Sequence, residues 1–92
     1  MKVKCKNCLP TEGIEIPEFT QSEKLKLKEL TILSPLEATK YIKDNYTVSL
    51  RDAKYIVTHI NISYGHCTRC NFNNLIGEYI NCPKCGALNF NW

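Results

Sequence analysis

The chain has 92 residues, of which 43% are hydrophobic, and its formal net charge is +3 at pH 7. A chain of this length forms one domain, or one small domain with an appendage, and it often needs a metal ion or disulfides to be stable. This mild charge is far from the strongly basic footprint of a sequence-independent nucleic-acid binder, and charge alone does not choose a partner.

Six cysteines occur, in three C-x-x-C pairs. The N-terminal stretch MKVKCKN lacks the apolar segment of a signal peptide, and no apolar run is long enough to span a membrane. We therefore expect a cytoplasmic protein without membrane contact. In a reducing cytosol, paired cysteines at this spacing are typical of metal ligands rather than of disulfides.

The first segment, residues 1–19, begins with a C-x-x-C pair and continues as a stretch that contains Pro10, Gly13 and Pro17. Apolar and acidic residues alternate along its second half, with Ile14, Ile16 and Phe19 on the apolar side. This alternation predicts an extended arm with one apolar edge lying on the body of the protein, which would carry the cysteine pair towards the C-terminal segment.

The second segment, residues 20–62, is predicted to contain three helices. Each expected helix starts with a hydroxyl residue followed three positions later by an acid, the pattern of a helix N-cap. The three pairs are Thr20 with Glu23, Ser34 with Glu37, and Ser49 with Asp52. Residues 24–30 (KLKLKEL) alternate strictly and fit a strand equally well, but the cap favours a helix there.

Apolar residues recur at helical spacing in all three expected helices. The first contributes Leu25, Leu27, Leu30 and Leu33, and the second Leu36, Ile42 and Tyr46 with Thr39 or Lys40. The third has the clearest apolar face, formed by Ala53, Ile56, Val57 and Ile60.

Residues 36–57, LEATKYIKDNYTVSLRDAKYIV, resemble the helix–loop–helix of the C-terminal domain of the bacterial ribosomal stalk protein. In that family the hairpin recruits translation factors through exposed lysines and an arginine. The resemblance implies a partner-binding function for Lys40, Lys43, Arg51 and Lys54. Thr47 and Ser49 replace both turn glycines of the family, so the loop needs another conformation, or one without positive φ. The four basic side chains also fit the solvated face of an amphipathic helix pair.

The third segment, residues 63–92, carries two C-x-x-C turns with eleven residues between them. Two such turns supply four thiolates in the tetrahedral arrangement that zinc accepts. The predicted metal ligands are Cys67, Cys70, Cys82 and Cys85. The stretch CPKCG, residues 82–86, resembles the second cysteine turn of zinc-ribbon and rubredoxin-like families. The resemblance implies a zinc ribbon built of hairpins; iron is the chemical alternative, which the short separation of the turns disfavours.

Aromatic residues are frequent in this third segment, and Arg69 and Lys84 lie at the tips of its cysteine turns. Exposed aromatic and basic side chains bind nucleic acid in some ribbons. Because a ribbon of this size has little other core material, we expect most of the rings to pack inside, with Trp92 on the sheet or the helices.

The remaining pair, Cys5 and Cys8, has four interpretations. It forms half of a second zinc site that His66, His59 or both complete, or it joins a second molecule in a metal-linked homodimer. It acts as a redox pair, or it shares the main site and leaves another pair outside. We favour a second or shared metal site, giving one or two zinc ions per chain.

These patterns predict an α+β protein with a helical middle, a C-terminal zinc ribbon and an extended N-terminal C-x-x-C arm. No catalytic triad, phosphate-binding glycine loop or open metal site is visible, so we expect no enzyme activity. The leading functional hypothesis is a zinc-binding adaptor that docks on another protein, with a link to the translation machinery. The alternatives are RNA or DNA binding through Lys2, Lys4, Lys6, Arg69 and Lys84, and a thiol–disulfide protein.

Overall fold

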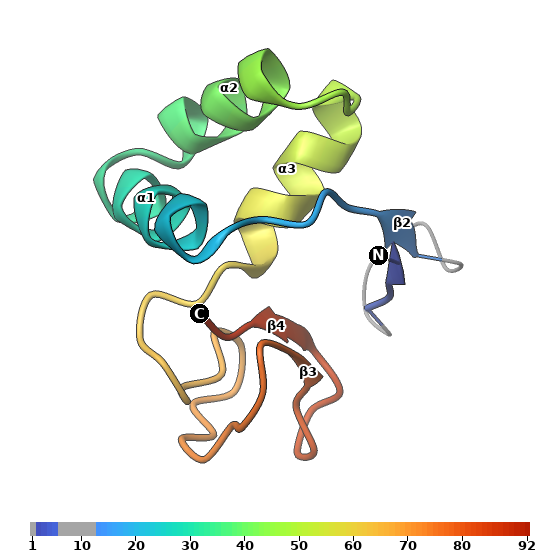
Figure 1. The fold of residues 1–92 in the computed structure, drawn as a ribbon. Helices are drawn as coiled ribbons and strands as arrows, with labels where there is room; N and C mark the ends of the chain where they lie inside the picture. The colour runs from blue at the N-terminus through green and yellow to red at the C-terminus, as the bar shows by residue number, and fades with distance from the viewer. Residues whose placement is uncertain (1, 6–12) are drawn as a thin grey trace.

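The structure is a computed structural model that describes residues 2–5 and 13–92. Its elements, in chain order, are β1 (Lys2–Val3), β2 (Ile14–Glu15), α1 (Gln21–Leu33), α2 (Pro35–Asn45), α3 (Leu50–His59), β3 (Tyr79–Asn81) and β4 (Leu88–Phe90). Two antiparallel sheets pair β1 with β2 and β3 with β4. The fold is α+β, as the sequence predicts. Figure 1 shows the helices on one side and the β3–β4 hairpin with its loops on the other.

Each helix begins directly after the residue that the sequence identifies as its N-cap. The cap hydroxyl accepts a hydrogen bond from the backbone N–H of the predicted acid, at 3.2 Å for Glu23, 3.4 Å for Glu37 and 3.1 Å for Asp52. The Glu23 carboxylate also accepts a hydrogen bond from the Thr20 N–H at 2.9 Å, which completes a capping box. Residues 24–30, whose alternation also fits a strand, therefore belong to helix α1. None of the helices in the described part of the chain is long and apolar enough to cross a membrane.

The described second half of the N-terminal arm, residues 13–19, packs on the body of the protein, as its alternation predicts. Ile14, Ile16 and Phe19 are buried and belong to the main core, while Glu15 and Glu18 are exposed. The Phe19 ring meets Tyr46 at the end of α2, with centroids 5.0 Å apart, and Trp92 at the other end of the chain, at 5.5 Å. The arm therefore bridges the helices and the C-terminal residues (Figure 1).

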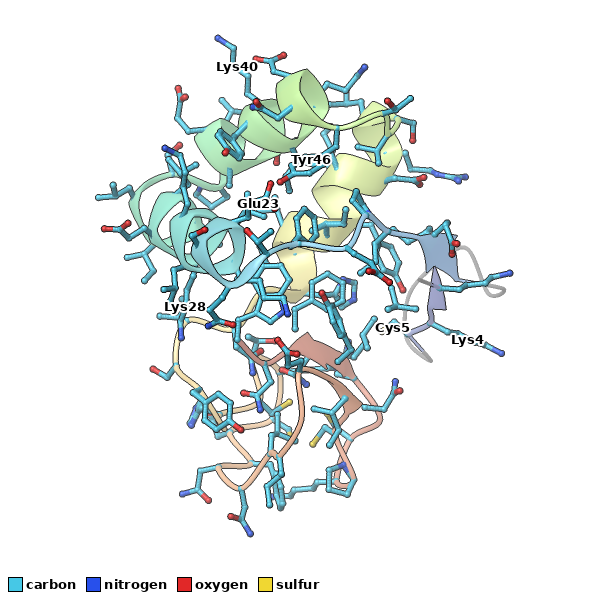
Figure 2. All side chains as sticks on the ribbon, in the orientation of Figure 1. Lys4, Cys5, Glu23, Lys28, Lys40 and Tyr46 are labelled. Atoms are coloured by element: carbon cyan, nitrogen blue, oxygen red, sulfur yellow. The ribbon has the colours of Figure 1, made fainter. Side chains whose placement is uncertain are left out.

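The last strand, β4, belongs to the core of the helices. Phe90 is fully buried and lies in the same apolar cluster as Leu27, Ile42 and Ile56. Its carbonyl accepts the Asn61 N–H at 3.0 Å, directly after α3. The Lys28 ammonium donates a hydrogen bond to the Trp92 carbonyl at 2.7 Å (Lys28 is labelled in Figure 2). Helices and ribbon segment are thus joined by buried contacts.

The apolar face of α3 is confirmed, because Ala53, Ile56, Val57 and Ile60 are all buried. The faces predicted for the other two helices are partly wrong: Leu25, Leu33 and Leu36 are 54%, 81% and 77% exposed. Leu27 of α1 and Ala38 and Ile42 of α2 are the fully buried apolar residues of these two helices, and Leu30 packs partly buried against the same core. Leucine side chains therefore remain on the surface at the α1–α2 junction.

The loop between α2 and α3 lacks the turn glycines of the stalk-protein pattern, and it reverses the chain without a residue in the left-handed conformation. Among the described residues other than glycine, Asn71 is the one with positive φ, so Thr47 and Ser49 adopt ordinary backbone angles. The Val48 N–H donates to the Tyr46 carbonyl at 3.0 Å, and Val48 packs against the core. The Tyr46 hydroxyl donates to the Glu23 carboxylate, which fixes this loop to the start of α1 (Figure 2).

Candidate metal centre

The two cysteine turns repeat one local backbone design. In each, the first cysteine donates its N–H to a carbonyl five residues on: Cys67 to Phe72 at 2.7 Å and Cys82 to Ala87 at 2.8 Å. The residue after the second cysteine has positive φ, 66° at Asn71 and 80° at Gly86. Glycine takes this conformation freely, and asparagine is among the few other residues that tolerate it. The chain therefore reverses at the same point of each turn.

The regular strands are confined to the second turn. β3 leads into Cys82 and β4 leads away from it, as expected for a ribbon hairpin. Around the first turn, over residues 61–78, the structure has no regular strand. There the backbone pairs through the Leu75 N–H, which donates to the Gly65 carbonyl at 3.0 Å. Buried asparagine side chains take the place of a strand ladder in holding these loops.

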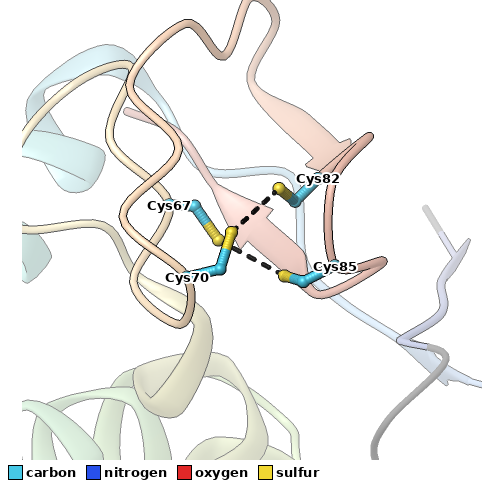
Figure 3. A group of neighbouring side chains, drawn as sticks. All are labelled: Cys67, Cys70, Cys82 and Cys85. Carbon is cyan, nitrogen blue, oxygen red and sulfur yellow. Dashed lines mark hydrogen bonds between the residues drawn. The ribbon is translucent and has the colours of Figure 1, made fainter.

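The four C-terminal cysteines converge on one point, as Figure 3 shows. Their sulfur atoms all lie within 4.8 Å of one another. The Cys67–Cys85 and Cys70–Cys82 sulfur separations are 3.8 Å and 3.5 Å, far longer than a disulfide bond. A tetrahedral zinc site with Zn–S bonds of about 2.3 Å places its sulfurs about 3.8 Å apart. The four cysteines could therefore bind a metal ion, and the donor set and spacing fit zinc.

Hydrogen bonds and mutual repulsion distribute negative charge unevenly over the sulfurs. Burial acts to raise the pKa of Cys67, but the N–H groups of Arg69 and Cys70 and the Asn89 amide outweigh it and lower the pKa to about 6. For Cys82, backbone N–H groups likewise outweigh burial and lower the pKa.

Cys70 behaves in the opposite way. The Phe72 N–H acts to lower its pKa, but burial and hydrogen bonds with the other three sulfurs raise the pKa to about 12. Four thiolates at these distances repel one another, so the last one resists losing its proton. A divalent cation at the centre removes this repulsion, because metal coordination deprotonates a thiol outright. The centre therefore favours a cation.

Three asparagines behind the cysteines are fully buried, and their importance was not evident from the sequence: Asn61, Asn89 and Asn91. Asn89 contacts the first cysteine turn. Asn91 accepts the Gly65 N–H at 2.6 Å and donates to the carbonyls of Leu75 and Gly77 at 3.3 and 2.9 Å. No local pattern marks them as buried: Asn89 and Asn91 alternate with apolar residues, which is typical of the solvent side of a strand.

The N-terminal pair is only partly described. Cys5 is buried at 2% exposure within the main core and lies outside the group of four cysteines. The Asn81 amide, next to Cys82, donates to the Lys4 carbonyl at 3.2 Å, so the arm reaches the ribbon (Lys4 and Cys5 are labelled in Figure 2). Cys8 lies outside the described residues, as does Lys6. The second or shared metal site therefore stays a prediction.

The two histidines lie in different surroundings, and neither belongs to the group of four cysteines. His59 is buried, its Nδ1 lies 2.6 Å from the Tyr55 carbonyl oxygen, and its ring packs against Phe90. Burial lowers the pKa of His59, although the contact with the Tyr55 carbonyl partly opposes this. His66 is exposed, with Nε2 3.3 Å from the Asn71 side-chain oxygen.

The basic residues predicted to bind a partner separate into two groups. Lys40, Lys43 and Lys54 line one surface groove on α2 and α3. Arg51, in the same helix pair, instead forms an exposed ion pair with Asp52 at 3.3 Å. Arg69 and Lys84 are exposed in the two cysteine turns, where the Arg69 N–H donates to the Cys67 sulfur at 3.5 Å.

The aromatic residues of the ribbon segment are mostly packed inside, as expected. Phe90 and Trp92 are buried, with ring centroids 5.6 Å apart, and Tyr79 meets both. Tyr64 is the exception at 62% exposure. Comparison of the chain with family models, curated proteins and solved structures finds no match to any of them.

Proposed function

We propose that the protein is a non-enzymatic adaptor whose fold is held by a structural zinc ion and whose helices α2 and α3 bind another protein. A zinc ion on four thiolates has no coordination position for substrate or water, so its contribution is structural. The geometry that supports this is the convergence of Cys67, Cys70, Cys82 and Cys85.

The candidate site for partner binding is a groove of about 390 Å³ between α2 and α3. Leu36 and Leu50 form its apolar part and are 77% and 51% exposed. Lys40, Lys43 and Lys54 surround it, and Figure 2 shows Lys40 on the outer side of α2, away from the ribbon. Large leucines exposed within a basic rim are typical of a protein-binding surface.

The chemistry of the groove indicates a partner segment with apolar and acidic side chains. The lysines would meet the acids, while Leu36 and Leu50 would bury the apolar anchors. Glu37 is the acid among the lining residues, beside three lysines, so the local charge is positive. Nucleic acid would use the lysines but would leave both leucines exposed to water, and protein is therefore the better fit.

The resemblance of residues 36–57 to the ribosomal stalk hairpin makes translation factors the first partners to test. Lys40, Lys43 and Lys54, which fall on that family's pattern, support the link because they gather at the groove. Arg51 supports the link to translation less, because its side chain pairs with Asp52 and does not line the groove.

Replacing Leu36 by glutamine is expected to weaken the binding of purified translation factors by about tenfold or more, the loss typical of an interface anchor. Leu36 lies in the first turn of α2 with most of its side chain exposed, so the fold should persist. Calorimetric titration of the wild type and the variant measures the change in affinity.

Leu33→Gln is the matched control, because Leu33 is 81% exposed and does not line the groove. Equal losses in both variants would contradict docking at the groove. The absence of binding to any translation factor would contradict the link to translation. Binding of RNA or DNA that weakens steeply with salt, and that ignores Leu36→Gln, would favour the nucleic-acid alternative.

A further inference from the structure

Asn89 links the two cysteine turns through its side chain. It lies in β4, after the second turn, and is fully buried. Its amide nitrogen lies 3.5 Å from the Cys67 sulfur and 3.0 Å from the Ala87 carbonyl oxygen. Its amide oxygen accepts the Thr68 N–H at 3.1 Å and faces the Thr68 hydroxyl at 3.5 Å. All these partners belong to the cysteine turns or adjoin them.

The neighbours of Asn89 fix the direction of its amide group. The Thr68 N–H can only donate, so it must face the amide oxygen, and the Ala87 carbonyl can only accept, so it must face the nitrogen. A flipped amide would place two donors together at Thr68 and two acceptors together at Ala87. The remaining N–H therefore points at the Cys67 sulfur.

The Cys67 sulfur consequently accepts from two sides. The Arg69 N–H approaches it from within the turn at 3.5 Å, and the Asn89 N–H approaches from β4. Hydrogen bonds that orient and stabilise a metal ligand are worth a large factor in affinity, because they fix the ligand before the metal arrives. Cys67 is itself fully buried, so its direction is set by these contacts.

We propose that Asn89 is a positioning residue for the metal centre, which directs the Cys67 thiolate at the ion and holds the first turn at the correct distance from the second. The inference rests on the proposed zinc site. Loss of the Asn89 side chain is expected to lower zinc affinity by about 10- to 100-fold, the range measured for groups that orient metal ligands elsewhere.

If Asn89 only tethers Thr68 to β4, the wild type and two Asn89 variants should rank differently in zinc affinity than if it acts on the Cys67 sulfur. Asn89→Asp keeps the acceptor for the Thr68 N–H but removes the donors to Cys67 and to the Ala87 carbonyl, and it adds a negative charge beside the thiolates. Asn89→Ala removes the acceptor and the donors. If Asn89 acts on the sulfur, zinc affinity falls in the order wild type, Ala, Asp; if it only tethers the loop, the order is wild type, Asp, Ala.

The experiment titrates zinc and cobalt(II) into the full chain against a competing chelator. Asn91→Ala is the control, since Asn91 is an equally buried asparagine two residues on whose contacts are with Asn61 and backbone groups. It should lower affinity through stability alone. The thiolate-to-cobalt absorption band should move to lower energy in Asn89→Ala, because the sulfur loses a donor, and stay in place in Asn91→Ala.

The two proposals can fail separately. A wild type that binds neither metal would overturn the zinc site itself. A wild type that binds zinc, with the Asp variant tighter than the Ala variant or with the cobalt band unmoved in Asn89→Ala, would overturn the function of Asn89 alone. If Asn89→Asp fails to fold with metal, the cobalt band of Asn89→Ala decides.

Discussion

Removal of the metal by a chelator is expected to unfold the helices together with the cysteine loops, in a single transition. Without a cation the four clustered cysteines cannot all become thiolates, and the two turns have few strand contacts to hold them. The second turn is continuous with β4, whose Phe90 lies in the helical core. Unfolding of the cysteine turns therefore also removes the core contacts that β4 makes with the helices.

The expected loss is large because metal binding and folding are one equilibrium in small domains of this kind. Chelation should abolish most of the helical circular dichroism signal, and added zinc should restore it. Helices that keep their signal after the metal has left would show that α1, α2 and α3 fold independently of the ribbon segment. Thermal unfolding in excess zinc should also shift to higher temperature as free zinc rises.

Phe90→Ala is expected to destabilise the protein by about 3–5 kcal/mol, which is a large part of the stability of a domain of this size. Phe90 is fully buried, and its ring contacts His59, Tyr79 and Trp92 with centroids 5.9, 5.2 and 5.6 Å away. It also lies beside Ile60 through a backbone bridge. The cavity would open where the helices meet β4.

Chemical denaturation of the zinc-loaded protein measures this loss. Tyr64→Ala is the control, because Tyr64 is an aromatic residue of the same segment that is 62% exposed, and it should change stability by no more than about 0.5 kcal/mol. Similar losses in the two variants would show that the contact between β4 and α3 contributes little to stability.

Features encoded within a few neighbouring residues could be predicted from the sequence. Thr20 with Glu23 and Ser34 with Pro35 fix their helix starts locally, because the cap satisfies backbone N–H groups within one turn. The C-x-x-C spacing likewise brings two sulfurs together without help from distant residues. The third helix was predictable in its buried face because its apolar stripe is wide and continuous.

Features that depend on which surfaces meet could not be predicted. Leu33 and Leu36 have the spacing of core residues, yet they are exposed, while Leu27 and Ile42 of the same helices are fully buried. Asn89 and Asn91 look like the solvent side of a strand, but the cysteine loops cover that side and use the amides as hydrogen-bond partners. Their burial follows from long-range packing, which no local pattern contains.

The groove between α2 and α3 combines a feature that the sequence predicts with one that it does not. The lysines that line it fall on a recognisable hairpin pattern, but Leu36, one of its two leucines, was expected on the apolar face of its helix. The exposed leucines form the apolar part of the proposed binding surface. The lysines follow a local sequence pattern, whereas the exposure of the leucines depends on how the helices pack.

Counting the metal ions in the protein, by native mass spectrometry after purification without added metal, tests the central claim most directly. The four-cysteine centre predicts one zinc ion that remains bound in Cys8→Ser and is lost when Cys67 and Cys82 are both replaced by serine. An additional zinc ion that disappears in Cys8→Ser would support the second site. Zinc that is lost in Cys8→Ser but retained without Cys67 and Cys82, or a wild type with no metal, would contradict the account.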